Sequence, residues 1–178
     1  RKFHRTRAAT KISFVARDIE YQFKNSTKGI RKFSFTKESG NLIGIMGGSG
    51  AGKSTLLNIL SGKLKPQSGQ ITINGYDIHQ EESMIEGIIG FVPQDDLLME
   101  ELSVFTNLYL NAKLCLSNLS HSELLKRVEQ VLSDLDLEEI KDLKVGSPLN
   151  KLISGGQRKR LNIALELIRE PAVLFLDE

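Results

Sequence analysis

The alternation of apolar and polar residues predicts mainly β-structure near the start of the chain. ISFVARDIEYQF at 12–23 and IRKFSFTK at 30–37 alternate as strands do, and NLIGIM at 41–46 has the continuous apolar character of a short buried strand. Further on, GQITINGYDI places Asn74-Gly75 between two apolar-rich segments, which indicates a hairpin. We therefore expect an antiparallel portion beside a buried strand that leads into a helix.

The spacing becomes helical between about 100 and 140. LSVFTNLYLNAKL and SHSELLKRVEQVLSDLDLEEI repeat apolar residues every three to four positions. Ser120 and Glu123 have the spacing of a capping box at the start of the second helix. The apolar residues of this helix that fall on one face are Leu124, Leu125, Val128, Val131, Leu132 and Leu135.

The last part of the chain predicts one more helix and one more strand. After the loop VGSPLNKLISGG we expect a helix from about Gln157 to Arg169. AVLFLD at 172–177 is a continuous apolar run of strand length, as expected for a strand buried on both faces. The pattern as a whole predicts an α/β core with a helical insertion.

Composition narrows the class of protein. Among 178 residues, 24 are basic and 22 acidic, so the net charge of +2 gives no general case for nucleic-acid binding. Cys115 is the single cysteine, which excludes an internal disulfide and favours a reducing cytosolic setting. No apolar run approaches the roughly 20 residues of a spanning helix. Because the chain starts at Arg1 and stops in an apparent core strand, we expect it to be a fragment of a longer protein.

The segment GGSGAGKS at 47–54 carries the most specific chemistry. It matches the phosphate-binding P-loop pattern completely, between an apolar run and the helical segment KSTLLNILSGK. Its backbone N–H groups would point at phosphate oxygens, Lys53 would supply positive charge, and the Ser54 hydroxyl would ligate Mg²⁺. The alternative is a glycine-rich turn with an incidental lysine. The expected nucleotide-binding residues are Gly47, Gly48, Ser49, Gly50, Ala51, Gly52, Lys53, Ser54 and Thr55.

Two further positions fit the chemistry of a nucleotide site. Asp177 ends the last apolar strand, the Walker B arrangement, and its carboxylate would hold Mg²⁺, while Glu178 would polarise the attacking water as a general base. Taken alone, this acidic pair would only end a strand. Gln94 follows the apolar stretch GIIGFV, where its amide would sense the metal or the γ-phosphate. The expected catalytic residues are Lys53, Gln94 and Glu178, and the expected metal ligands are Ser54, Gln94 and Asp177.

The turn ISGGQ provides a second set of anion-binding groups. Ser154, Gly155, Gly156 and Gln157 precede or open a helix, whose first N–H groups favour an anion. If the P-loop is already filled by the chain's own nucleotide, the second anion would be the γ-phosphate presented by another subunit. The alternative is a plain helix cap formed by Ser154.

These motifs, in this order, resemble the nucleotide-binding domain of ATP-binding cassette (ABC) proteins. GFVPQDDLLMEELSV and VGSPLNKLISGGQRKRLNIALELI resemble the White-type subfamily of sterol, pigment and multidrug half-transporters and its bacterial relatives. The resemblance implies one truncated domain over 1–178. Its β subdomain and P-loop core lie at 1–93, its Gln loop and helical subdomain at 94–156, and its signature helix and Walker B strand at 157–178.

The resemblance also implies an aromatic residue that stacks on adenine. Phe23 is the first candidate and Tyr21 the second, with core packing as the alternative for either. Ile153 stands where leucine is commoner, and Thr106 where many cassettes have glutamate. None of His4, His79 and His121 lies at the expected position of the switch histidine.

As a member of this group, the chain is expected to bind ATP and Mg²⁺ and to act as the ATPase motor domain of a transporter, with the White-type likeness favouring export. The implied partners are a second nucleotide-binding domain and a transmembrane domain on the same parent chain, at the cytoplasmic face of a membrane, without nucleic acid. The alternatives are a soluble cassette acting on ribosomes or chromosomes and a regulatory ATP-binding module. The span between Gln94 and Ser154 lacks the sustained heptads of chromosome-type cassettes.

Overall fold

A computed structural model describes residues 11–147 and 152–177. The chain divides into two compact units, Arg1–Glu86 and Gly87–Glu178. The P-loop therefore belongs to the first unit, and every predicted site residue from Gln94 onward belongs to the second. Two residues considered above, His4 and Glu178, lie outside the described residues.

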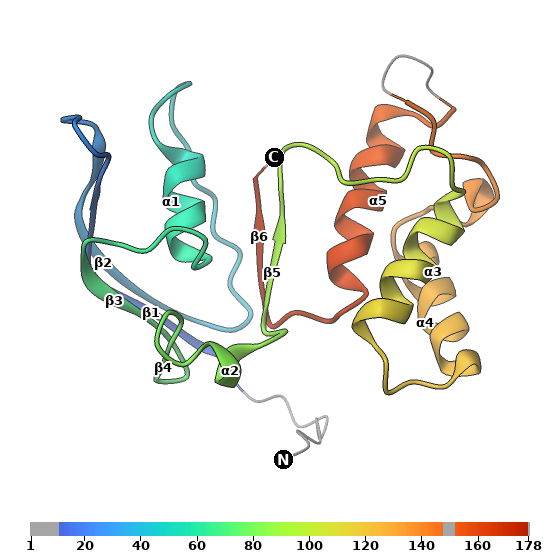
Figure 1. Cartoon of the computed structure of the whole chain (residues 1–178), viewed down its shortest axis with the longest axis horizontal. Coiled ribbons are helices and arrows are strands. Elements are labelled where there is room, and N and C mark those ends of the chain that lie inside the picture. The colour runs from blue at the N-terminus through green and yellow to red at the C-terminus, as the bar shows by residue number, and fades with distance from the viewer. Residues whose placement is uncertain (1–10, 148–151, 178) are drawn as a thin grey trace. The chain divides into compact units, whose positions relative to one another are not determined.

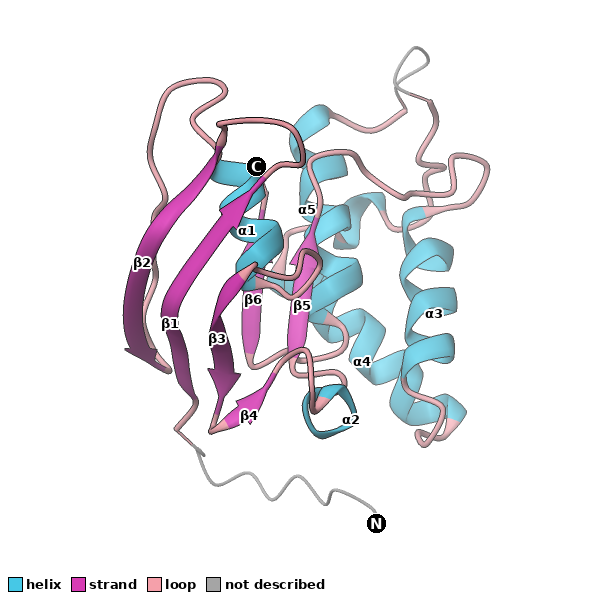
Figure 2. Ribbon diagram, turned by 60° about the vertical axis from the view of Figure 1, so that its left-hand side comes forward, coloured by secondary structure: helices cyan, strands magenta, loops and turns pink. Residues whose placement is uncertain are grey.

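The first unit is built on an antiparallel sheet with the strand order β2-β1-β3-β4 (Figure 2). Its buried side chains come from alternate positions of the strands, as the apolar pattern predicted, and include Phe14, Ala16, Ile19, Ile71 and Ile73. The strands are β1 (Ser13–Gln22), β2 (Gly29–Glu38), β3 (Ser68–Ile73) and β4 (Tyr76–Asp77).

Two tight backbone features shape this sheet. The predicted hairpin is present between β3 and β4, where Asn74 and Gly75 adopt φ of 52° and 87°, the left-handed values of a two-residue turn. The register of β1 against β3 shifts between Arg17 and Glu20. Opposite this irregularity, Gly69 has a φ of 85°, and a Cβ there would lie 2.4 Å from the carbonyl oxygen of Asp18. Only glycine fits that close approach.

The helical elements of the first unit are α1 (Lys53–Leu60) and the short α2 (Glu82–Ile85). The prediction of a strand at 41–46 is wrong for the described structure: this segment has no strand conformation, and Leu42 and Met46 are almost fully exposed. A strand exists only through hydrogen bonds to a neighbour, and none of the described strands pairs with this segment. An apolar run predicts a tendency to be buried but does not specify a partner strand.

The second unit pairs a short parallel sheet with a helical layer (Figure 1). The strands are β5 (Ile89–Val92) and β6 (Val173–Leu176), and the helices are α3 (Val104–Cys115), α4 (His121–Asp134), the 3₁₀ turn η1 (Glu138–Ile140) and α5 (Gly155–Leu167). The helices share a core formed by Leu98, Val104, Leu108, Ala112, Leu124, Val128, Val131, Leu132, Leu137, Val145, Ile153, Leu161, Ala164 and Ile168.

The strand prediction for β6 was only partly correct. The strand forms, but its first three residues are half-buried and Leu176 is exposed, whereas burial on both faces was expected. β5 is the one strand among the described residues that pairs with it. One neighbour leaves the other edge and part of each face of a two-stranded sheet uncovered.

The helix predictions agree more closely. Of the six apolar residues on the predicted face of α4, four are buried, while Leu125 and Leu135 are half-buried. Ser120 and Glu123 form the predicted capping box. Helix α5 begins at Gly155, two residues earlier than predicted, because a second capping box fixes its start at Ser154.

A buried asparagine shapes the approach to α3. Asn107 is 2% exposed, and its side-chain oxygen accepts a hydrogen bond from the Met99 N–H at 2.8 Å. Its amide nitrogen donates to the carbonyl oxygens of Met99 and Ser103, both at 3.0 Å. One side chain therefore fixes both ends of the loop that leads into α3. The Thr106 hydroxyl lies 2.8 Å from that of Ser103 at the same helix start, so here it serves the helix end.

Candidate nucleotide-binding site

The P-loop is already curled around its lysine. The Lys53 ammonium donates hydrogen bonds to the carbonyl oxygens of Gly47 and Gly48, both at 2.9 Å. The turn is closed by a hydrogen bond from the Ala51 N–H to the Gly48 carbonyl oxygen at 3.2 Å. These contacts hold a positive charge at the centre of the loop. A positive charge at this place suits a polyphosphate, whose negative charge needs to be neutralised.

Helix α1 opens directly from this loop. Gly52 caps it in the left-handed region, with a φ of 92°, and makes no side-chain cap hydrogen bond. Glycine has no side chain that could cap the first-turn N–H groups in the way that serine or aspartate does. Ser54 and Thr55 lie in that first turn, and no acidic residue lies there to repel an anion. The arrangement fits a phosphate group at the positive end of the α1 dipole.

The aromatic candidates lie at the P-loop end of the sheet. Tyr21 pairs with Ile30 across β1 and β2, and a Cβ on Gly52 would lie 3.3 Å from the Ile30 side chain. Phe23 is 42% exposed and packs edge to face on Tyr21 at 5.1 Å between ring centroids. An aromatic ring exposed to that extent does not serve as core packing. Its position remains compatible with the predicted stacking on a base.

In the second unit, the parallel strands bring Gln94 and Asp177 to one edge. Val92 is in register with Leu176, and the Asp177 N–H donates to the Val92 carbonyl oxygen at 2.9 Å. Asp177 thus follows β6 at the same edge where Gln94 follows β5. Carboxyl ends of parallel strands are where α/β sheets place their ligand-binding groups. Within residues 11–147 and 152–177, no three His, Cys, Asp or Glu side chains form a metal-binding group.

The signature turn combines a helix cap with an open glycine pair. The Ser154 Oγ accepts from the Gln157 N–H at 3.2 Å, and the Ser154 N–H donates to Gln157 Oε1 at 2.7 Å. The interpretation of Ser154 as a helix cap is thus confirmed. Gly155 and Gly156 are not in the left-handed region, and a Cβ on Gly155 would meet nothing within 4 Å. The chain's own packing therefore gives no reason for glycine at 155.

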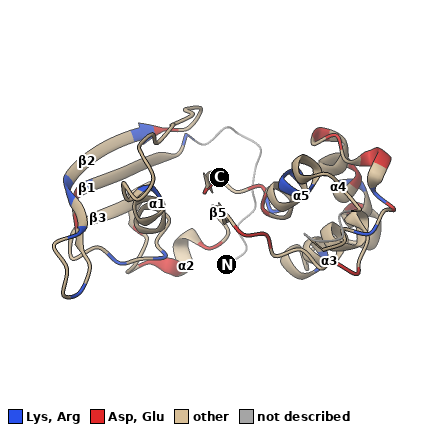
Figure 3. Ribbon diagram, turned by 90° about the horizontal axis from the view of Figure 1, so that it is seen from above, with Lys and Arg blue, Asp and Glu red and all other residues tan. Residues whose placement is uncertain are grey.

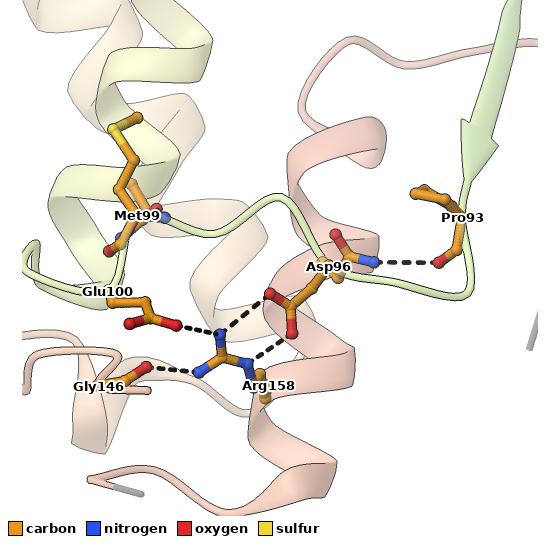
Figure 4. A network of polar contacts seen from close by, with 8 residues as sticks. Pro93, Asp96, Met99, Glu100, Gly146 and Arg158 are labelled. Atoms are coloured by element: carbon orange, nitrogen blue, oxygen red, sulfur yellow. Dashed lines mark hydrogen bonds and ion pairs between the residues drawn. The ribbon is translucent and has the colours of Figure 1, made fainter. Parts of the chain in front are cut away.

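Sequence reasoning missed the main polar contact of the second unit. The Arg158 guanidinium binds the Asp96 carboxylate through two contacts, Nε to Oδ2 at 2.5 Å and Nη2 to Oδ1 at 3.0 Å (Figure 4). Its Nη1 donates to the Gly146 carbonyl oxygen at 2.6 Å, and Glu100 lies 3.8 Å away. The Arg158 guanidinium, through its hydrogen bonds and charge, holds the pKa of Asp96 below its ordinary value.

Charge pattern was the only available signal for this contact. Figure 3 shows acidic residues between β5 and α3 and basic residues at the N-terminal end of α5. In the sequence these are Asp95, Asp96, Glu100 and Glu101 on one side and Arg158, Lys159 and Arg160 on the other. The pairing partners are far apart in the sequence, so local periodicity could not match them.

Comparison with known proteins identifies the family. The sequence pattern described as ABC transporter matches residues 30–178. The chain belongs to the ABC transporter family. A probable ATP-dependent permease of Saccharomyces cerevisiae is 43% identical over 163 residues, which cover 90% of this chain and 15% of that protein. ABC transporter G family member 28 of Arabidopsis thaliana is 39% identical over 171 residues, which cover 94% of this chain and 15% of that protein.

A further relative, the broad substrate specificity ATP-binding cassette transporter ABCG2 of Sus scrofa, is 34% identical over 178 residues, 98% of this chain and 26% of that protein. The White-type resemblance is thereby confirmed. This ABC transporter chain spans 15 to 26% of the length of these three relatives. The described residues contain no helix with the length and apolar character of a membrane span.

The fold is also confirmed by a solved structure. CbiO1 from Clostridium perfringens, part of the ABC transporter complex cbiONQ, matches with a TM-score of 0.79 and 31% sequence identity. The match covers 93% of this chain and 64% of that chain. The α/β fold is that of a P-loop NTPase core with an antiparallel β subdomain and an inserted helical subdomain. Membership of this family implies nucleotide binding.

Proposed function

We propose that this chain is the ATP-binding and ATP-hydrolysing motor domain of an ABC transporter, with export as its direction of transport. The observation that carries the proposal is the P-loop with the Lys53 ammonium held between the Gly47 and Gly48 carbonyl oxygens. An ammonium held at the start of a helix supplies the positive charge that a triphosphate requires. Relatives named as permeases and transporters favour transport over the ribosomal, chromosomal and regulatory alternatives.

The roles of the individual residues follow from their chemistry. Lys53 neutralises phosphate charge, and the N–H groups of 47–55 bind phosphate oxygens. Ser54, Gln94 and Asp177 are the proposed ligands of Mg²⁺, which when bound neutralises the charge that develops on the phosphates. Glu178 is the proposed general base. The shared edge of Gln94 and Asp177 supports the assignment of these two to one metal.

The signature turn is proposed to act on the nucleotide of a second copy. The N–H groups of Gly155 and Gly156, with no Cβ on either residue, offer donors that a phosphate could approach closely. Ile153 is buried in the core of the second unit and thereby anchors this turn. ATP would then be bound between two domains, and the closing and opening of that pair would drive a transmembrane domain on the parent chain at the cytoplasmic face of a membrane.

Binding of a fluorescent ATP analogue tests the central claim. Lys53→Ala should weaken binding at least about tenfold, because a charge-assisted hydrogen bond contributes about 1.5–3 kcal/mol. Lys65→Ala, which removes an exposed lysine beyond α1, is the matched control and should bind as the wild type does. Thermal unfolding of both variants checks that the fold is intact. Equal affinity of the folded Lys53→Ala variant and the wild type would refute the proposed nucleotide site.

A further inference from the structure

One face of α5 carries three polar side chains at a four-residue spacing, Arg158, Asn162 and Glu166. Each of them contacts the segment that runs from β5 into the Gln94 loop. Glu166 Oε2 accepts from the Phe91 N–H at 3.4 Å, and Asn162 Nδ2 donates to the Pro93 carbonyl oxygen at 3.4 Å. We name these three side chains, with their contacts to Phe91, Pro93 and Asp96, the α5 ladder.

The contact at the N-terminal end dominates the ladder. The hydrogen bonds of Glu166 and Asn162 are long, at 3.4 Å. Arg158 instead forms two charge-assisted hydrogen bonds with the Asp96 carboxylate, at 2.5 and 3.0 Å. The side chains of this pair are only 13% and 26% exposed, so water screens their attraction weakly. The Gly146 carbonyl oxygen fixes the third side of the guanidinium (Figure 4).

This geometry joins the two functional segments of the second unit. Gln94 lies between Pro93 and Asp96, and both of these residues are held by α5. Ser154 lies one turn before Arg158, whose N–H donates to the Ser154 carbonyl oxygen at 2.9 Å. The Gln94 loop and the signature turn are therefore attached to the same helical turn. Displacement of one, with the ion pair intact, displaces the other.

We infer that the Asp96–Arg158 ion pair is a positioning element that makes the Gln94 loop and the Ser154 turn move as one body. The inference rests on the proposed function, in which Gln94 serves the chain's own nucleotide and Ser154 that of a second copy. The pair then couples the two nucleotides of the dimer. Breaking it leaves each P-loop able to bind ATP but removes the mutual dependence of the two sites.

The test uses the full-length protein and measures ATP affinity, kcat and the Hill coefficient for ATP hydrolysis. In Arg158→Ala and Asp96→Ala we expect ATP affinity within about twofold of wild type, a fall in kcat of about tenfold or more, and a Hill coefficient reduced toward one. The double variant should lose no more than Arg158→Ala alone, because that substitution already removes the contact with Asp96. Lys159→Ala, an exposed neighbour on the same turn, should behave as wild type.

Two conservative variants keep the test valid if an alanine variant does not fold. Arg158→Lys keeps the charge and loses the bidentate geometry, and Asp96→Asn keeps the shape and loses the charge. Both should fold and give intermediate kcat values and Hill coefficients. A merely structural role would change the melting temperature without changing the Hill coefficient in the folded protein.

The failures are distinguishable. If the wild-type protein binds no ATP, the proposed function falls, and this inference falls with it. If the wild type binds and hydrolyses ATP cooperatively and the folded alanine variants match it, the inference alone is overturned. Losses that multiply in the double variant would also overturn it, because Arg158 and Asp96 would then act independently.

Discussion

Asn107→Ala should destabilise the second unit by about 2 kcal/mol. The substitution removes three hydrogen bonds of 2.8 to 3.0 Å that fix the backbone at Met99 and Ser103. A neutral hydrogen bond contributes about 1 kcal/mol net, which gives about 3 kcal/mol for the three. Alanine recovers roughly 0.5 kcal/mol through its higher helix propensity, and water reaches the half-exposed Met99 in part. The Leu102 contact at 3.5 Å adds little.

Urea unfolding followed by far-UV circular dichroism measures this change. Helices α3, α4 and α5 all belong to the second unit, so the helical signal reports mainly its unfolding. The melting temperature should fall by roughly 4–8 °C, at about 2–4 °C per kcal/mol for a chain of this size. Asn107→Asp should be at least as destabilising at neutral pH, because an ionised carboxylate accepts hydrogen bonds but donates none to the two carbonyl oxygens.

Asn111→Ala is the matched control, one turn further along α3. Its side-chain oxygen accepts from the Cys115 thiol at 3.2 Å in an exposed position, so its loss should change stability by no more than about 0.5 kcal/mol. If Asn107→Ala proves no more destabilising than Asn111→Ala, the buried asparagine does not fix the loop, and the reasoning from its hydrogen bonds is refuted.

Gly69→Ala should destabilise the first unit by more than about 2 kcal/mol, because its φ is 85° and the new Cβ would lie 2.4 Å from the Asp18 carbonyl oxygen. Gly75→Ala, with a similar φ but open space around it, should lose only about 1 kcal/mol, and urea midpoints compare the two. Asp96, whose pKa is lowered by Arg158, should stabilise the second unit at neutral pH and lose that effect as the pH falls below about 4. The difference in unfolding free energy between wild type and Asp96→Asn should therefore shrink in acid, and a difference that grows would contradict the assigned pair.

Features encoded within a few consecutive residues were predictable from the sequence. The Asn74-Gly75 hairpin and the Ser120 capping box each need residue types at fixed short spacings, and each appears where expected. The face of α4 followed from its period, because neighbouring turns of one helix are buried together.

Features that depend on distant partners were not predictable. The segment 41–46 has the composition of a buried strand, but none of the described strands pairs with it. The Asp96–Arg158 pair joins residues 62 positions apart, and the residues next to each of them do not indicate which partner it binds. Single charged residues are common on protein surfaces. Only the folded structure shows whether two of them form a close ion pair or are both solvated.

The capping box at Ser154 has a consequence for how this position can vary as sequences diverge. Ser, Thr, Asn and Asp all begin helices well, so folding alone would accept any of them there. The cap uses the hydroxyl oxygen as an acceptor, whereas a phosphate requires the hydroxyl as a donor. An aspartate could accept the cap hydrogen bond, but its negative charge would repel a phosphate. Descendants that keep the helix but carry aspartate at this position would retain the fold and lose the anion binding that is proposed for the signature turn.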